Sequence, residues 1–407
     1  MDLELRTIRP DEVPAYALAD SYAFGYRLED GEAQLHLPWV AGELDRAFAM
    51  FEDDDVVGLG RNFSLELTMP GGEPIAAGGV SWIGVRPTHR RRGILTRIMT
   101  TLLDESTERG ESVSMLTASE AAIYGRFGFG IASRHRSVSI DVRGAQLRDA
   151  PPPGRVRYVE AGESHALAPV LFERVRRITP GAVSRPEHWW PGEWAPAHDV
   201  KPRFDVVYER DGRVDGLAVY SVKQDWSAGV PSHTAVVRDV LAATTEAEIA
   251  LWRFLCELDL VTIVEAEHVP VDTVLPWLFT DSRRVRTTLL SDWGWVRPLD
   301  VPAYLSARRY DAAARLVLEV HDRFRPEGAA AGRFVLDAGP DGASCTRTTE
   351  EPDLVLGVDD VGAVSLGDTR PSLLVRVGRI EERTGGAARA ADRAFATERA
   401  PFLMTWF

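Results

Sequence analysis

Hydrophobic and polar residues alternate with a period of two in the first third of the chain. Residues 62–69 read NFSLELTM, and a second apolar run at residues 75–85 follows the turn sequence PGGEP. A period of two is typical of strands with one buried face, so the two runs predict a β-hairpin. The glycines in the second run weaken it as a strand, which indicates a bulge or a close approach of a ligand.

The period then changes to that of a helix. Residues 86–93, RPTHRRRG, form a polar turn, and apolar residues recur at helical spacing after it, namely Ile94, Leu95, Ile98, Leu102 and Leu103. This spacing predicts an amphipathic helix. A strand at residues 112–117 and a short helix around residues 121–124 complete the unit, and this order of elements is typical of an α/β fold.

The later parts of the chain show a related pattern. Residues 204–209 and 214–222 predict a hairpin, residues 234–240 a strand, and residues 245–258 a helix opened by a threonine-rich cap with Glu248 three residues on. Further on, residues 332–336 and 373–377 predict strands, and residues 387–395 predict a helix. The turn LAATTEAE, before the helix at 245, contains neither an arginine run nor a glycine.

Three units follow from these patterns, and their boundaries fall at proline-rich or polar stretches. We expect domains at residues 1–142, 143–286 and 287–407. Three consecutive prolines, Pro151, Pro152 and Pro153, lie just after the first boundary, where neither a helix nor a central strand can continue. A chain of 407 residues is also too long for one ordinary hydrophobic core.

Composition narrows the class of protein. A net charge of −14 argues against nucleic acid as the main partner and is compatible with cationic ones. Cys256 and Cys345 lie in unrelated segments without metal-type spacing, so we expect no disulfide framework, no zinc site and a reducing cytoplasm. The charged start MDLELRTIRPDE predicts no signal peptide, and no apolar run is long enough to predict a membrane span.

The polar turn at residues 86–93 carries the clearest chemistry. A helix N-terminus offers unpaired N–H groups and the positive end of the helix dipole, and both favour a bound diphosphate. Gly93 lets the backbone approach phosphate oxygens, and the neighbouring arginines add charge-assisted hydrogen bonds. A solvated basic turn beside a helix is the alternative interpretation.

At this place the sequence resembles the GNAT superfamily of acetyl-CoA-dependent N-acetyltransferases, whose signature is Q/R-x-x-G-x-G/A. The run from Arg90 to Leu95 keeps the first arginine and the glycine, whereas Leu95 stands where the signature has glycine or alanine. The block ASEAAIYGRFGFG at residues 118–130 resembles more narrowly the enhanced intracellular survival (Eis) family. The ending RIEERTGGAARAADRAFATERAPFLMTWF is similar to the C-terminus of that family.

This resemblance spans the whole chain and implies two tandem GNAT-type mixed-sheet domains followed by a sterol-carrier-like α/β domain. The second GNAT domain would be a degenerate copy, as its turn LAATTEAE without arginine or glycine indicates. The resemblance also implies a homohexamer.

The resemblance further implies which residues bind acetyl-CoA. Ile83, Gly84 and Val85 would border the pantetheine arm, and the N–H of Val85 would stabilise the thioester oxyanion. Ser119 and Glu120 would flank the site from the next strand. The diphosphate would be wrapped by residues of the basic turn and the helix start, namely Arg91, Arg92, Gly93, Ile94, Leu95 and Thr96.

Two residues would carry the chemistry by this resemblance. Tyr124 would be the general acid that protonates the departing thiolate, the alternative being a packing aromatic. The carboxylate of Phe407 would be the base, acting directly or through a water. The apolar tail PFLMTWF is suited to fixing that terminus in the interior, the alternative being an ordinary terminal core strand. His89 and His135 lack an evident partner carboxylate and receive no role.

The implied substrates are amines, among them aminoglycosides and protein lysines, and no metal, nucleic acid or membrane is expected. The acidic run at residues 52–55 lines the substrate entrance or is a solvated turn. The aromatic residues Tyr22, Phe24, Tyr26 and Trp39 are candidates for the acceptor wall. Two other functions remain open: a non-enzymatic lipid or sterol carrier, and a regulator that binds acetyl-CoA without turnover.

Overall fold

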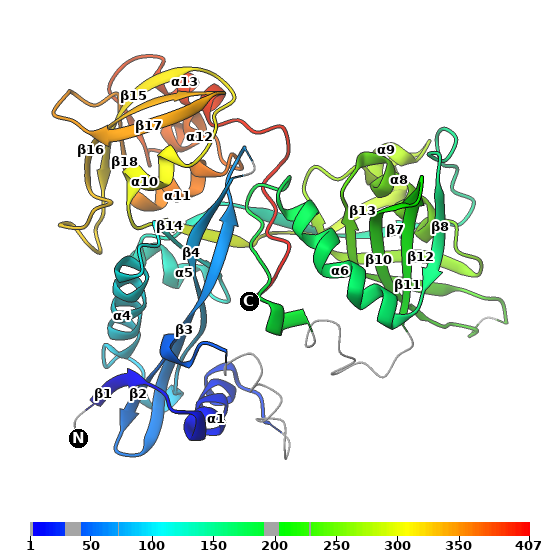
Figure 1. Ribbon diagram of the computed structural model, residues 1–407, viewed down its shortest axis with the longest axis horizontal. Helices are drawn as coiled ribbons and strands as arrows, with labels where there is room; N and C mark the ends of the chain where they lie inside the picture. The colour runs from blue at the N-terminus through cyan, green and yellow to red at the C-terminus, as the bar shows by residue number, and fades with distance from the viewer. Residues whose placement is uncertain (1–2, 29–41, 72, 191–202, 228) are drawn as a thin grey trace.

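The computed structural model describes residues 3–28, 42–71, 73–190, 203–227 and 229–407. Figure 1 shows three bodies, each built around a β-sheet, with the C-terminal segment running between them to an end near the centre of the molecule. Trp39, one of the aromatics expected at the acceptor wall, lies outside the described residues.

The first sheet has seven strands in the order β1-β2-β3-β4-β5-β14-β6. Helix α4 packs its apolar face on this sheet, and its buried residues Ile94, Ile98 and Leu102 follow the spacing seen in the sequence. The hairpin and the helix predicted from the sequence are therefore confirmed. The elements of this part are β1 Leu3–Thr7, η1 Pro10–Glu12, α1 Val13–Phe24, η2 Leu44–Arg46, β2 Ala47–Glu52, β3 Asp55–Thr68, β4 Pro74–Val85, η3 Pro87–His89, α4 Ile94–Glu108, β5 Val113–Thr117, α5 Ala121–Tyr124, η4 Gly125–Phe127 and β6 Gly130–Ile131.

The second sheet also has seven strands, in the order β13-β7-β12-β11-β10-β9-β8. As in the first sheet, a parallel pair, β11 and β12, is connected by a helix, α8. The elements are β7 Arg134–Asp141, β8 Arg155–Val159, α6 Ala161–Arg176, η5 Glu187–Trp189, β9 Arg203–Arg210, β10 Arg213–Lys223, β11 His233–Ala242, α8 Thr245–Cys256, β12 Val261–Pro270, α9 Leu275–Leu278, η6 Ser282–Arg284 and β13 Val285–Asp292.

The third sheet has five strands in the order β17-β16-β15-β18-β19. The strand predicted at residues 373–377 is wrong, because these residues lie in helix α12 and the turn after it, with Pro371 at the first helical position. The helix predicted at 387–395 is confirmed as α13. The elements are β14 Gly294–Pro298, α10 Val301–Ser306, β15 Ala314–His321, β16 Gly332–Gly339, β17 Gly342–Arg347, β18 Leu354–Gly357, α11 Val358–Ser365, α12 Pro371–Arg376, β19 Glu381–Glu382 and α13 Ala387–Ala394.

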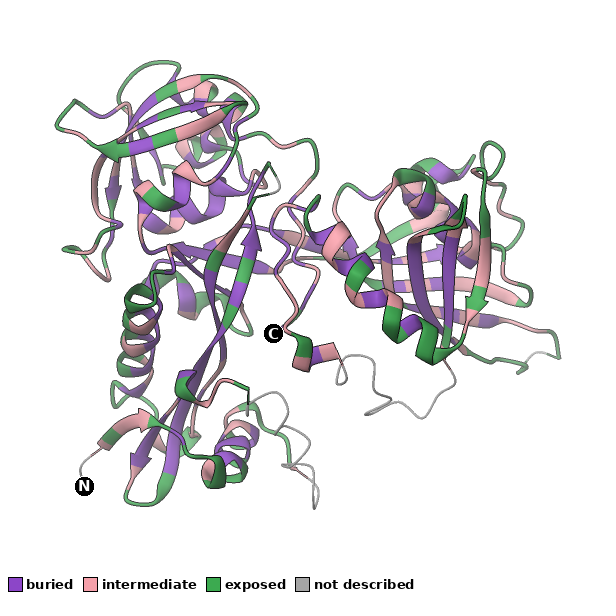
Figure 2. Ribbon diagram, in the orientation of Figure 1, coloured by how far each residue is buried: buried purple, intermediate pink, exposed green. Residues whose placement is uncertain are grey.

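The sheets exchange strands along the chain. Strand β7, which precedes residue 142, pairs in the second sheet, whereas β14 follows that whole sheet and pairs with β5 and β6 of the first. Figure 2 shows the strands at the centre of the first sheet buried along most of their length. One hydrophobic cluster includes residues of β3, β5 and β14 together with the third sheet, so the first and third bodies share a core.

The C-terminal segment, residues 395–407, is held at several points along its path. The N–H of Phe402 donates to the carbonyl of Pro180 (2.8 Å), and the indole N–H of Trp293 donates to the carbonyl of Leu403 (3.1 Å). Leu403 and Phe407 belong to the hydrophobic cluster of the first and third bodies. The tail is thus fixed between the second body and the other two.

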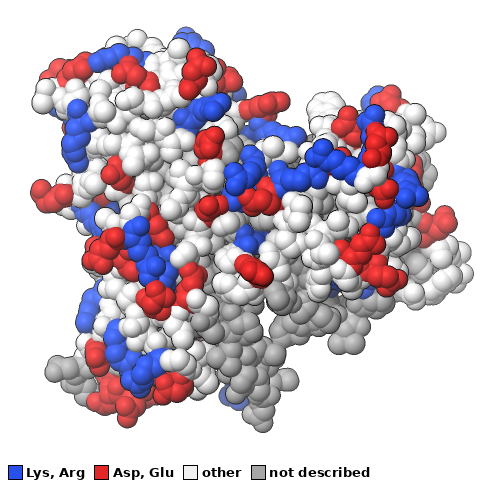
Figure 3. Space-filling view, viewed as in Figure 1, with Lys and Arg blue, Asp and Glu red and all other residues white. Residues whose placement is uncertain are grey.

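Charged side chains of both signs are intermingled on the face seen in Figure 3. No helix in the described ranges is long and apolar enough to cross a membrane.

Candidate active site

The first sheet opens into a V between the parallel strands β4 and β5. The two strands pair only from Ala77–Val113 to Gly79–Met115, and beyond this last pair they separate. The arm of β4 beyond Gly79 contains the predicted residues Ile83, Gly84 and Val85. Backbone groups that face such a gap are free to pair with a ligand.

A bulge lies on the open arm of β4. The register with β3 shifts between Leu59 and Arg61, and Trp82 on the bulge has a φ of 52°. Packing leaves no room for a side chain at Gly84, since an added Cβ would lie 2.8 Å from the Cβ of Ala23 on α1. The glycines of this strand predict a bulge or a close approach of a ligand, and the bulge is present.

The direction of the Val85 backbone follows from strand pairing. The N–H of Arg86 donates to the carbonyl of Val57 (2.9 Å), and the next residue pair is Val85 with Gly58. Hydrogen-bonded and non-hydrogen-bonded pairs alternate in antiparallel strands. Val85 is therefore in a non-hydrogen-bonded pair, and its N–H points away from β3, toward the open side of the sheet.

The basic turn leads from β4 into α4 and has the form of an anion site. Arg91 and Gly93 have φ values of 63° and 77°, and nothing lies within 4 Å of a Cβ built on Gly93. The turn is followed by the N-terminus of the 15-residue helix α4, whose first N–H groups have no partner within the helix. In the described part of the chain no carboxylate pairs with Arg90 or Arg91. The residues present thus fit a diphosphate.

Glu52 at the end of β2 supports this turn. Its carboxylate pairs with Arg92 (2.7 Å) and with Nε2 of His89 (2.9 Å). These two hydrogen bonds lower the pKa of Glu52 to about 2, and the bond with Arg92 has the larger effect. The expectation that His89 lacks a partner carboxylate is wrong, because the partner lies 37 residues earlier in the sequence, at the end of β2. Residues 53 and 54 form the β2–β3 turn.

The other arm of the V carries Tyr124. The chain leaves β5, passes the residues Ser119 and Glu120, and reaches Tyr124 at the end of α5. Tyr124 is 5% exposed and packs edge-on against Phe129. Burial raises the pKa of its phenol, while a hydrogen bond with Ser119 acts in the opposite direction. Tyr124 therefore keeps its proton at neutral pH.

The last residue of the chain lies where the V begins. A Cβ built on Gly79 would be 3.1 Å from Cε2 of Phe407, and Gly79 is in the last residue pair before the strands separate. The Phe407 ring also packs edge-on against Phe63 at 6.4 Å. The side chain of Phe407 is 7% exposed. The fold thus brings the tail to the first sheet across more than 300 residues of sequence.

Arg185 holds the tail in this position, and Trp189 packs against Phe63, which also contacts Phe407. No sequence pattern indicated either residue. Arg185 donates from Nε to the hydroxyl of Thr405 (2.8 Å) and from Nη2 to the carbonyl of Met404 (3.2 Å). Trp189 is fully buried and packs edge-on against Phe63 at 4.8 Å. No local motif surrounds either residue, because their partners are distant in sequence.

The aromatics expected at the acceptor wall lie along α1 and just after it. Tyr22, Phe24 and Tyr26 are each more than 40% exposed, and the guanidinium of Arg86 lies over the ring of Tyr22 at 5.4 Å. Trp82 on the bulge stacks on Tyr16 of the same helix at 5.7 Å. Helix α1 thus borders the open arm of β4. No cluster of metal-ligating side chains is found in the described ranges.

Comparison with protein-family models gives three matches. Acetyltransferase (GNAT) domains match residues 4–132 and 181–298, and a sterol carrier protein domain matches residues 301–404. An uncharacterized N-acetyltransferase of Streptomyces griseus is 40% identical over 99% of both chains. The fold and the site therefore define a GNAT-type N-acetyltransferase, an enzyme class that transfers an acetyl group to an amine.

Two further comparisons identify the family. N-acetyltransferase Eis of Mycobacterium tuberculosis is 34% identical over 84% of both chains. The crystal structure of Eis1 from Mycobacterium abscessus superposes with a TM-score of 0.89, covers 99% of this chain and 100% of its own, and is 33% identical. The chain belongs to the Eis family of N-acetyltransferases, with two GNAT domains and a sterol-carrier-like domain.

Proposed function

We propose that the protein transfers the acetyl group of acetyl-CoA to amines of cationic small molecules, such as aminoglycosides, or to lysine side chains. One observation carries the proposal: the V of the first sheet has an arginine-rich helix start on one arm, a buried tyrosine on the other, and the tail at its base. Charge complementarity supports a cationic acceptor, since the net charge is −14.

Acetyl-CoA would lie along the open arm of β4 with its diphosphate on the basic turn. Ile83, Gly84 and Val85 would border the pantetheine arm, while Ser119 and Glu120 would flank it from the end of β5. Arg91 is exposed and has no ion-pair partner among the described residues, and the first N–H groups of α4 have no partner within the helix, so both suit the phosphates. Arg92 would contact the phosphates while it keeps its ion pair with Glu52. The full diphosphate set is Arg91, Arg92, Gly93, Ile94, Leu95 and Thr96.

The transfer then needs three groups of this chain. A neutral amine attacks the acetyl carbonyl carbon, and the N–H of Val85 donates to the developing oxyanion. As the C–S bond breaks, the phenol of Tyr124 gives its proton to the sulfur, forming the free thiol of coenzyme A. The carboxylate of Phe407 takes the proton lost by the amine, directly or through a water. The phenolate and the carboxyl group recover their resting forms by proton exchange with solvent.

A thiol-release assay across aminoglycosides, polyamines and lysine peptides tests this proposal. Tyr124→Phe should lower kcat by about 10²- to 10⁴-fold, the usual contribution of a positioned acid, with little change in acetyl-CoA affinity. Removing Phe407, or appending residues after it, should abolish turnover while acetyl-CoA still binds. Unchanged kcat in either variant would refute the role given to that residue.

Calorimetry with acetyl-CoA, together with the thiol-release assay, separates the enzyme from the other functions considered. A lipid or sterol carrier would show no heat on calorimetric titration with acetyl-CoA, and a regulator would bind acetyl-CoA but release no thiol with any amine. We also propose that the protein works in the cytoplasm as a homohexamer. Sedimentation equilibrium of the full chain tests the assembly, and a monomer of 45.0 kDa would contradict it.

A further inference from the structure

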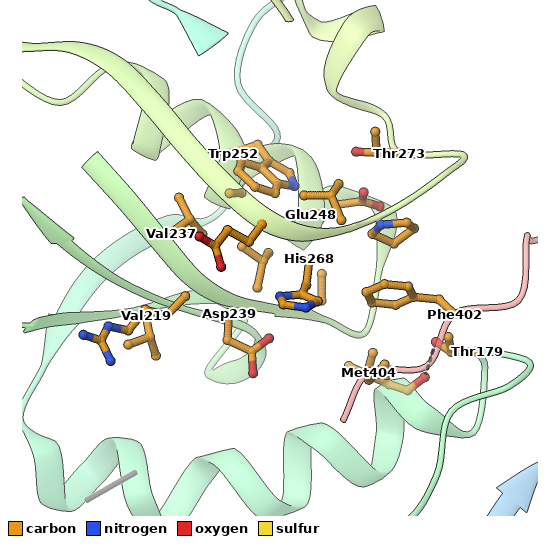
Figure 4. Close-up of a pocket in the computed structure, with 18 of the residues that line it drawn as sticks. Thr179, Val219, Val237, Asp239, Glu248, Trp252, His268, Thr273, Phe402 and Met404 are labelled. Atoms are coloured by element: carbon orange, nitrogen blue, oxygen red, sulfur yellow. Dashed lines mark hydrogen bonds between the residues drawn. The ribbon is translucent and has the colours of Figure 1, made fainter. Parts of the chain in front are cut away.

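The second sheet contains a cavity of about 1330 Å³ at the position equivalent to the V of the first. Strands β11 and β12 pair up to Val237–Ala266 and then separate. Helix α8 and the C-terminal tail close the gap, with Phe402 and Met404 among the residues of the wall (Figure 4).

The helix start beside this cavity does not suit an anion. The hydroxyl of Thr244 occupies the first turn of α8 by accepting from the N–H of Ala247 at 3.1 Å. Glu246 and Glu248 follow in the same turn, and carboxylates repel a phosphate there. The cavity therefore does not repeat the diphosphate site of the first domain.

Glu248 is the charged residue that α8 contributes to the lining of the cavity. The sequence had placed it in a helix cap, but the cap is Thr244, and the Glu248 carboxylate instead accepts from the N–H of Val274. In the described part of the chain no cation lies within ion-pair distance of it; Arg399 acts only through longer-range charge. Burial raises the pKa of Glu248, so an added positive charge would favour its ionised form.

Trp252 lies one helical turn further along the same face of α8. It is only 4% exposed and lines the cavity, yet no acceptor in the described ranges bonds to its indole N–H. Figure 4 shows its ring beside Glu248, with the ring nitrogen at the edge nearest that residue. An aromatic side chain beside a carboxylate that has no ion-pair partner suits the binding of an organic ammonium ion.

Two of the other charged side chains at the cavity bind the tail, and the wall also includes Arg203, Lys223, Arg238, Asp239, Glu267, Glu398 and Arg399. Arg185 holds Thr405 and Met404 of the tail, and the carboxylate of Asp272 accepts from the N–H of Ala400 (2.8 Å). Much of the remaining wall is apolar, including Val219, Val237 and Leu403. Where Glu248 and Trp252 form the wall, it matches a ligand that carries a positive nitrogen on an apolar body.

We propose that this cavity is a second ligand site, which binds an amphipathic organic cation through Glu248 and Trp252. The site goes beyond the proposed acetyl transfer, because it lies in the other GNAT domain and uses none of the residues assigned there. The tail forms part of its wall and ends at the first sheet, so a bound cation contacts the segment that leads to Phe407.

Benzyltrimethylammonium is a suitable probe, since a quaternary nitrogen cannot be acetylated. Calorimetric titration of the full-length protein should show binding, and saturating acetyl-CoA should leave the Kd unchanged. Glu248→Gln should weaken binding by about tenfold, and Trp252→Phe by about threefold. Glu246→Gln is the matched control, because it removes a carboxylate from the same helical turn at an exposed position outside the cavity.

Two further measurements distinguish a loss of binding in Glu248→Gln from a loss of folding. The substitution Glu248→Gln removes a charge that burial disfavours, so the Tm of this variant should equal or exceed that of the wild type. Benzyl alcohol, a neutral aromatic, should bind equally to both proteins. Equal Kd values for the ammonium probe in Glu248→Gln and wild type, or loss of binding when acetyl-CoA is added, would overturn the proposal.

Discussion

Tyr124 and Phe407 are held by different kinds of contact. Tyr124 contacts two residues close to it in sequence, Ser119 and Phe129. Both lie in the same block, residues 118–130. Phe407 depends on Gly79 and Phe63, more than 300 residues away. The family resemblance indicated both residues, Tyr124 through its flanking block and Phe407 through the C-terminal ending, but no local pattern showed which residues the tail would contact.

The raised pKa of Tyr124 has a consequence for pH dependence. The phenol acts as an acid, and burial moves its pKa above the ordinary value of about 10. Activity should therefore not fall through ionisation of Tyr124 below pH 10, and the alkaline limb assigned to it should lie above that value. A profile of kcat against pH with a saturating amine measures this. An alkaline loss below about pH 9 that disappears in Tyr124→Phe would contradict the assignment.

Among the elements, the basic turn at residues 86–93 contains Gly93 in a left-handed backbone conformation. Gly93→Ala places a side chain at a φ of 77°, where no atom is closer than 4 Å, so the cost is backbone strain alone. We expect a loss of about 1 kcal/mol in stability and a several-fold weaker affinity for acetyl-CoA. Thermal unfolding and calorimetry measure the two effects.

Gly110→Ala is a matched control for this substitution. Gly110 follows the other end of α4, also has a φ of 77°, and also has open space at the Cβ position. Its replacement should cost similar stability but leave acetyl-CoA affinity unchanged. Equal loss of affinity in both variants would show that the turn at Gly93 has no special part in binding.

Elements with strong local signals were predictable, and those that depend on packing were not. The alternation at residues 62–69 and the apolar stripe of α4 indicated the hairpin and the helix, although β3 begins seven residues earlier than the run. The sequence Leu-Leu-Val at 373–375 fits a strand equally well, and only its position after Pro371 favours a helix. The clamp by Arg185 joins segments that no local pattern connects.

At the scale of the whole molecule, the first domain is not independent of the rest. Strand β14 pairs with β5 along five residue pairs and with β6 along two. A fragment of residues 1–132 lacks β14, leaves the edge of β5 unpaired, and exposes the hydrophobic cluster to which Trp295 of β14 contributes in the full chain. It should show no cooperative thermal transition by circular dichroism and should aggregate, whereas the full chain melts cooperatively. A soluble fragment with a sharp transition would refute this dependence.

The insertion of β14 also fixes the order of events on the ribosome. Strand β5 ends at residue 117 and β14 begins at residue 294, so residues 118–293 are synthesised before the first sheet can close. At roughly 5–20 residues per second, the nascent chain carries an open sheet edge for about ten seconds or more. The domain that is translated first is thus completed late, and its open edge is available to other chains throughout that interval.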